Sequence, residues 1–351
     1  MKHIIQNFQP LDGHHCISTA YKQVLNYFGH KLSEEMIFGL ASALNFFYFD
    51  SKQIPFPMIG GRNKIGEFEK NLERHTGIKV NLNKTSSVKK AREELYKSIQ
   101  TDIPVALYVD MAYLGYLRLP RGSHFGGHAI VVFGIDEEKE TAYISDRDSN
   151  EKKITLSQNE NPADFHEIKL SDLETARSSK YKPFPAENKW VTFDFSLMKK
   201  LDKNIILPAI KQNAEQFLSP PIKNVGIKGL AHFANKVNSW RKFDDNKLNL
   251  ASFNTFIMIN QIGGTGGGAF RKMYGNFLIE SSEIIKIISL NSIGNKYIEL
   301  SVEWDKIGNK FLKIAKTLDR SILINIGKEL SCIYEIELNL MKSLQLISTN
   351  N

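Results

Sequence analysis

The apolar positions of the first 150 residues predict a helix and, further along the chain, three buried strands. From Ile17 the apolar residues recur at helical spacing as far as Phe28, and Gly29 then provides a C-terminal cap. Nearly continuous apolar runs rich in β-branched residues predict the strands, at 104–110, 129–136 and 141–146. A polar turn joins the last two strands, which are therefore expected to form a hairpin.

Shorter patterns predict the remaining elements of this half. They comprise helices from the Ser33 cap to about residue 44 and at 66–75, 87–99 and 171–177, and strands at 153–157, 166–169 and 189–195. The aromatic segment 45–63 is predicted to be an irregular loop, because Pro55, Pro57 and paired glycines interrupt regular structure. Such an apolar loop is expected to cover either the core or a substrate channel.

Beyond residue 197 the pattern changes to helices alone. Helical periodicity occupies six stretches, at 198–218, 225–240, 250–261, 269–289, 298–318 and 321–346. We therefore predict an α+β protein of two domains. Residues 1–196 are expected to form a mixed α/β domain, and residues 197–351 an all-α helical domain.

Composition narrows the class of protein. Of the 351 residues 42% are apolar and 24% charged, which is typical of a globular protein. The chain has no apolar run long enough to span a membrane and no signal-peptide core, so a cytoplasmic location without membrane association is expected. Two cysteines far apart in sequence, Cys16 and Cys332, do not suggest a disulfide framework. A net charge of +8 without a concentrated basic stripe argues against nucleic acid as a partner.

Cys16 is the strongest candidate for chemistry, because it stands where a loop becomes the first predicted helix. A thiol at a helix N-terminus faces unpaired backbone N–H groups and the positive end of the helix dipole, and both favour the thiolate. The functional interpretation is a nucleophilic cysteine. The alternative is a small buried residue at a helix start.

The predicted hairpin brings a histidine and an acid together. If it folds about residue 138, Ile130 lies opposite Asp146 and His128 opposite Asp148, so His128 and Asp146 are diagonal neighbours on one face. Cysteine, histidine and acid in this order match a papain-like cysteine-protease fold, in which the nucleophile begins a helix and its partners lie on strands. There His128 would take the thiol proton and Asp146 would orient the ring, with Asp148 as the alternative acid.

The residues around the cysteine suggest two further roles. The Cys16 N–H and the Gln9 side-chain amide are candidate donors to an oxyanion. His14, His15 and His128 with Cys16 are a candidate metal site. Adjacent histidines point apart, however, and the paired spacings of structural zinc are missing, so no metal is expected.

The glycine-rich run at 263–268, followed by Arg271 and Lys272, has the composition of a phosphate cradle. A dinucleotide-binding loop would follow a strand, whereas this run follows a helical pattern. A flexible turn between helices is therefore favoured over a contact with an anion.

Sequence blocks along most of the chain carry a family resemblance. In the first half they are Gly13-x-His15-Cys16-x-Ser18-Thr19, Leu32-Ser33-Glu34-x-Met36-x-Phe38-Gly39-Leu40, Gly61-Arg62, Gly127-His128-Ala129-x-Val131-Val132-x-Gly134-x-Asp136 and Leu173-x-x-Ala176-Arg177. These blocks resemble the N-terminal domain of the butirosin biosynthesis protein H family. The second half, with Thr265-Gly266-Gly267-Gly268-x-Phe270-Arg271-x-x-Tyr274-x-x-Phe277-Leu278, is similar to the uncharacterised domain that often accompanies it. His15 and Arg62, within these blocks, join Gln9 as candidates for oxyanion or substrate contacts.

The resemblance implies a cysteine-protease-like fold that performs acyl transfer instead of hydrolysis. Cys16 would take an acyl group from the phosphopantetheine thioester of an acyl or peptidyl carrier protein, and His128 would deprotonate the attacking amine of a small acceptor. The implied setting is natural-product biosynthesis. No cofactor is implied beyond the phosphopantetheine arm of the partner, and homo-oligomerisation is left open. The alternatives are a peptidase, amidase or thioesterase with the same site, and a non-catalytic binding protein that retains the fold.

Overall fold

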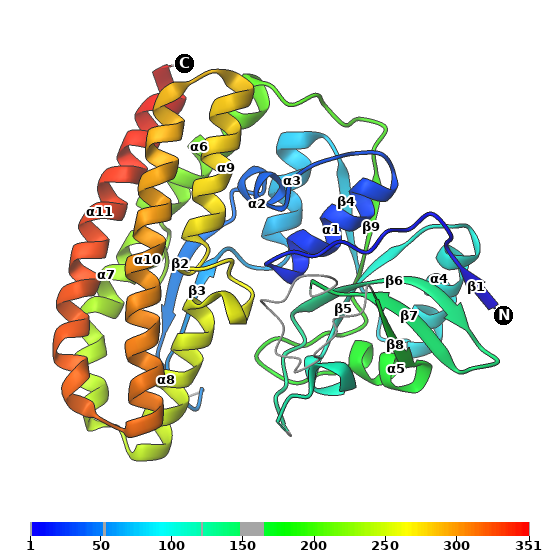
Figure 1. Ribbon diagram of the computed structural model, residues 1–351, viewed down its shortest axis with the longest axis horizontal. Coiled ribbons are helices and arrows are strands. Elements are labelled where there is room, and N and C mark those ends of the chain that lie inside the picture. Colours follow the sequence, from blue (N-terminus) through cyan, green and yellow to red (C-terminus); the bar gives the residue numbers. More distant parts are fainter. Residues whose placement is uncertain (1, 52–53, 121, 148–164, 351) are drawn as a thin grey trace. The chain divides into compact units, whose positions relative to one another are not determined.

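A computed structural model describes residues 2–51, 54–120, 122–147 and 165–350 (Figure 1). The chain forms two compact units, neither of which is continuous in sequence. The first unit comprises Met1–Ile37 and Ile78–Leu197, and the second comprises Phe38–Gly77 and Met198–Asn351. This division differs from the two contiguous domains expected from the sequence, because residues 38–77 group with the helical half.

The first unit is built on an antiparallel sheet. Within the described residues seven strands pair in the order β4-β9-β5-β6-β7-β8, and β1 pairs with the end of β6 that β5 leaves free. The strands are β1 (Lys2–Ile4), β4 (Lys79–Asn83), β5 (Val105–Val109), β6 (His128–Asp136), β7 (Thr141–Ser145), β8 (His166–Lys169) and β9 (Trp190–Asp194). Three helices pack on this sheet, namely α1 (Cys16–Tyr27), α4 (Val88–Gln100) and α5 (Leu170–Ser178). The short helices η1 (Met111–Tyr113) and η2 (Gly115–Leu117) follow β5.

The predicted helix and hairpin are both confirmed. Helix α1 buries the apolar stripe that begins at Ile17, and Gly29 follows its end with φ +84°. In the hairpin Val131 lies opposite Ser145, as folding about residue 138 requires. An irregularity at Gly134 shifts the register by one residue nearer the turn, away from His128. The strand predicted at 153–157 lies outside the described residues.

The second unit is mainly helical. Its elements are β2 (Leu44–Phe49), β3 (Met58–Arg62), α3 (Glu67–Thr76), α6 (Lys203–Leu218), α7 (Gly226–Lys236), η3 (Val237–Lys242), α8 (Asp245–Ile259), η4 (Gln261–Gly263), α9 (Arg271–Ile285), α10 (Ile288–Thr317), η5 (Arg320–Ile322) and α11 (Leu323–Asn350). Helix α2 (Glu34–Leu40) begins in the first unit and ends in the second. The α+β class and the helical C-terminal half are thus confirmed. No helix in the described part of the chain is long and apolar enough to cross a membrane.

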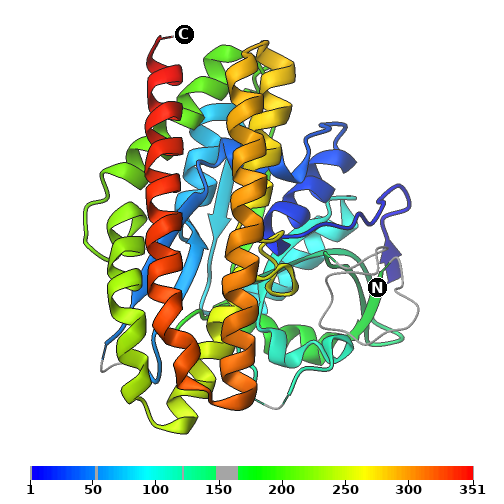
Figure 2. The same ribbon diagram turned by 60° about the vertical axis from the view of Figure 1, so that its left-hand side comes forward.

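The segment predicted to be an irregular aromatic loop is instead the hairpin β2–β3, and that prediction is wrong. Strand β2 contacts α6 and α7, and β3 contacts α8 (Figure 2). The Phe46 ring is buried between Phe233 and Trp304. Glycine is needed in β3 because the Phe47 ring occupies the space of a Gly60 side chain. This segment therefore forms part of the core of the second unit.

The glycine-rich run joins two helices, as predicted, and its residues 264–268 are buried. The Gly268 N–H donates to Asp305 Oδ1 at 3.1 Å, so a carboxylate lies where a phosphate would be held. Arg271 is fully buried, and its Nε and Nη2 donate to the two Glu337 oxygens at 2.7 and 2.9 Å. The same arginine donates to the Asn45 carbonyl at 3.2 Å, which ties β2 to the start of α9.

Candidate active site

Cys16 is the first residue of α1, and its side chain is half-buried. The preceding residue, His15, has an extended backbone and caps the helix, since its Nδ1 accepts a hydrogen bond from the Ser18 N–H at 3.4 Å. The cap leaves the Cys16 N–H at the open start of the helix, where backbone donors face outward. The sulfur therefore lies next to donors that can stabilise negative charge.

A buried carboxylate, that of Glu34, fixes the loop before α1. It accepts four hydrogen bonds, from the N–H groups of His14 (2.8 Å) and His15 (2.5 Å) and the hydroxyls of Ser18 (2.9 Å) and Thr19 (3.1 Å). Gly13 lies against the same cluster, where a side-chain Cβ would be only 2.1 Å from the Thr19 hydroxyl. These contacts explain why glycine, serine, threonine and a later glutamate accompany the cysteine in the sequence.

His128 connects Cys16 with Asp146. It is the first residue of β6, and its ring is buried. Its Nε2 lies 2.7 Å from Asp146 Oδ2, and the imidazole also forms a hydrogen bond with the Cys16 thiol. Because Nε2 faces the carboxylate, Nδ1 is the nitrogen left for the sulfur. This ring orientation is the reverse of that in the chymotrypsin triad.

The electrostatics of the site favour a thiolate–imidazolium pair. Burial raises the pKa of Cys16, but the hydrogen bond to His128, the Ala129 N–H and the charge of Arg147 together bring it below its ordinary value. Burial lowers the pKa of His128, whereas Asp146 and Cys16 raise it, with a net result of about 10. The ion pair is therefore the stable form between these two pKa values.

Asp146 directly follows β7 and is held from three sides. Its Oδ2 accepts a hydrogen bond from the Tyr116 hydroxyl at 2.7 Å as well as facing His128, and its Oδ1 accepts the Arg147 N–H at 2.6 Å. The Tyr116 ring stacks on His166 with centroids 3.9 Å apart. Burial raises the pKa of Asp146, but His128, Tyr116 and Arg147 outweigh it, so this pKa lies well below its usual range. The carboxylate stays charged and oriented toward the ring.

Arg147 ties the acid to the loop that carries the nucleophile. Its Nη1 donates to the His14 carbonyl at 2.8 Å, and its own carbonyl accepts the Gly13 N–H at 3.0 Å. Sequence reasoning missed both Arg147 and Tyr116. Arg147 contacts His14, 133 positions away, and Tyr116 contacts Asp146, 30 positions away. Arg147 directly follows the predicted acid, Asp146, in the sequence, and this position could have identified it as a candidate.

Among the described residues, Gln9 and Arg62 do not take part in the hydrogen bonds that link Cys16, His128 and Asp146. Gln9 is exposed in the segment between β1 and α1. Arg62 belongs to the second unit, where its Nη1 donates to the Asn63 carbonyl at 2.8 Å. The alternative acid, Asp148, lies outside the described residues. Within the described part of the chain, no group of three or more His, Cys, Asp or Glu side chains is arranged to hold a metal ion.

The lowered pKa of Cys16 predicts an unusual pH dependence of alkylation. A Cys332→Ser variant leaves Cys16 as the single thiol, since the chain has two cysteines. Its rate of reaction with iodoacetamide is expected to stay high as the pH falls below the value of about 8.5 typical of a free thiol. The rate should fall only at the lower pH where the thiolate takes up a proton. A rate that rises with pH around 8.5, as for an exposed cysteine, would contradict this prediction.

Two family models match the chain. The one described as "Butirosin biosynthesis protein H, N-terminal" matches residues 15–147, which include Cys16, His128 and Asp146. The one described as "Domain of unknown function (DUF4872)" matches residues 171–344. No curated protein matches the chain. The two models together account for most of the sequence, in the order that the sequence blocks predict.

Proposed function

The chain belongs to the butirosin biosynthesis protein H family, and from this premise we propose that it is an amide-forming acyltransferase of natural-product biosynthesis. Cys16 is the nucleophile, His128 moves the protons and Asp146 orients the ring. The observation that carries the proposal is the position of His128, which bonds the thiol of a helix-terminal cysteine and the carboxylate of Asp146 at the same time. The same arrangement supports a papain-like fold for the first unit.

In the first step the Cys16 thiolate attacks the carbonyl carbon of a carrier-bound thioester. A bond forms between Sγ and the acyl carbon, and the bond from that carbon to the phosphopantetheine sulfur breaks. The departing thiolate takes the proton of the His128 imidazolium, which leaves a neutral ring beside the acyl-enzyme. One thioester replaces another, so no amide bond has to be broken.

In the second step an amine attacks the acyl-enzyme. His128, now neutral, accepts a proton from the amine nitrogen as the new carbon–nitrogen bond forms. The bond between the acyl carbon and Sγ then breaks, and the thiolate–imidazolium pair is restored. Both steps pass through an oxyanion, for which the Cys16 N–H at the start of α1 is the available donor.

Mass spectrometry of the intact protein tests the proposal. An acyl-pantetheine thioester supplied without amine is expected to add one acyl mass to the Cys332→Ser variant, and nothing when Cys16→Ala is also present. Addition of primary amines should then remove the acyl mass and yield an amide. No acyl mass on Cys16 would overturn the proposal, and free acid formed at a rate independent of the amine would assign the site to a hydrolase.

A further inference from the structure

Basic charge is divided unequally between the two units. The first unit contains 20 Lys and Arg against 21 Asp and Glu, whereas the second contains 26 against 17. The positive charge of the chain therefore comes from the unit that lacks Cys16, His128 and Asp146. Neither step of the proposed acyl transfer involves the lysines and arginines of the second unit. The excess of positive charge on this unit therefore needs a separate explanation.

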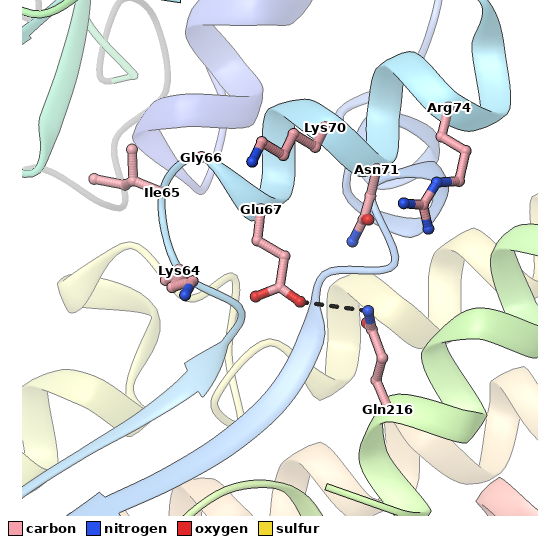
Figure 3. A pocket seen from close by; sticks show the side chains of 8 residues that line it. All are labelled: Lys64, Ile65, Gly66, Glu67, Lys70, Asn71, Arg74 and Gln216. Atoms are coloured by element: carbon pink, nitrogen blue, oxygen red, sulfur yellow. Dashed lines mark hydrogen bonds between the residues drawn. The ribbon is translucent and has the colours of Figure 1, made fainter. Parts of the chain in front are cut away.

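Two pockets on the second unit are lined in part by its basic residues. They lie where α3 meets α6, and they have volumes of about 340 and 410 Å³. Lys64 and Lys70 line the first pocket (Figure 3), Lys199 and Lys211 line the second, and Arg74 lines both. We call the region lined by these five residues the α3–α6 surface.

The α3–α6 surface presents more positive than negative charge. Two acids line the pockets beside the five cations, namely Glu67 and Glu215. Glu67 already accepts a hydrogen bond from Gln216 at 3.3 Å (Figure 3). The four lysines are exposed, and none of them is paired with an acid of the described chain. Their charges are available to a partner from outside.

Hydrogen bonds between the helices hold this surface in shape. Gln212 on α6 donates to Asn71 Oδ1 at 2.7 Å and accepts from Arg74 Nη1 at 2.8 Å, both on α3. The Lys199 N–H donates to the Thr76 carbonyl at 2.8 Å, which fixes this lysine at the end of α3. A surface that is already ordered loses little entropy when a partner binds.

We propose that the α3–α6 surface docks the acidic face of a partner protein, which is the carrier protein that delivers the acyl group. The identity of the partner rests on the proposed function, because that function requires a carrier-bound thioester to reach Cys16. Complementary charge raises the association rate and selects the partner, and this effect weakens as salt screens it. The surface therefore acts on the delivery of the donor and leaves the chemistry at Cys16 unchanged.

Charge reversal at two lysines tests the surface against a matched control. Lys70→Glu with Lys211→Glu changes one lysine in each pocket. Lys328→Glu with Lys342→Glu makes the same change of charge at two exposed lysines of α11, which lines neither pocket. Each protein is assayed for Cys16 acylation by the same acyl group on an acyl carrier protein from the same genome and on free pantetheine. Binding of the fluorescently labelled carrier is measured by anisotropy at low and high salt.

The test pair is expected to weaken carrier binding and slow acylation from the carrier about 10-fold or more at low salt, with the rate from free pantetheine within 2-fold of wild type. The control pair should change neither carrier binding nor the rate of acylation. High salt should weaken carrier binding by wild type until it approaches that of the test pair. Three results overturn the surface proposal: equal losses in both pairs, carrier binding unchanged in the test pair, or wild type that binds an oligonucleotide and no carrier. Failure of both the acyl-carrier and the acyl-pantetheine thioester to acylate Cys16 of wild type overturns the proposed function instead, while the binding measurement still decides the surface.

Discussion

Replacing Asp146 with asparagine is expected to slow acylation of Cys16 about 10³-fold at neutral pH. The carboxylate is the main partner that raises the pKa of His128 to about 10, and it holds the ring by a 2.7 Å contact at Nε2. Asparagine keeps the size of the side chain but removes its charge, so the pKa of His128 falls and the pKa of Cys16 rises. Less thiolate is then present, and the loss is measured as the single-turnover rate with an acyl-pantetheine thioester.

Tyr116→Phe provides the graded comparison. It removes one hydrogen bond to Asp146 and leaves the carboxylate charged, so a loss of about 10-fold is expected. Both variants should also show alkylation of Cys16 shifted to higher pH, with the larger shift for Asp146→Asn. If Asp146→Asn retained the wild-type rate and pH profile, Asp146 would have no part in the reaction.

Replacing Glu337 with alanine is expected to lower the free energy of unfolding of the second unit by about 3–5 kcal/mol. The carboxylate pairs with Arg271 and also accepts the Trp304 indole N–H at 2.9 Å. Its removal leaves the Arg271 charge fully buried without a counter-charge, which is far more costly than the loss of a surface pair. The measurement is urea unfolding followed by tryptophan fluorescence, since Trp240 and Trp304 both lie in this unit.

The matched control for this change lies two positions earlier on α11. Glu335 is exposed, so Glu335→Ala removes the same charge and the same side chain without emptying a buried site. Its effect is expected to stay within about 0.5 kcal/mol. Similar unfolding midpoints for the two variants would contradict this prediction. They would show that the buried pair of Arg271 and Glu337 contributes little to the free energy of unfolding.

Local pattern was sufficient to predict the elements that bear the candidate site. Helix α1 follows from the apolar spacing after Cys16, and the register of β6 and β7 near His128 follows from the length of their turn. Both depend on neighbours in sequence, which a pattern records directly. The pairing of His128 with Asp146 could be expected for the same reason, since the two residues lie in one hairpin.

Contacts between distant segments account for what the pattern missed. Strand β3 contains paired glycines that usually interrupt a strand, and they are required because the Phe47 ring and the Ala269 carbonyl take the space of their side chains. Arg271 follows a glycine-rich run as in a phosphate site, but Glu337, 66 positions away, pairs with it. Nothing near these residues in sequence records such partners.

The return of the chain to the first unit at Ile78 constrains how proteins of this architecture can be recombined. Because residues 38–77 pack with the helical half, a single crossover anywhere between residues 38 and 197 splits at least one unit between two parents. A chimera with both units intact needs three junctions, close to residues 37, 77 and 197. A gene library made by exchange at one junction would therefore yield few soluble hybrids, whereas exchange of 38–77 together with 198–351 transplants a complete unit.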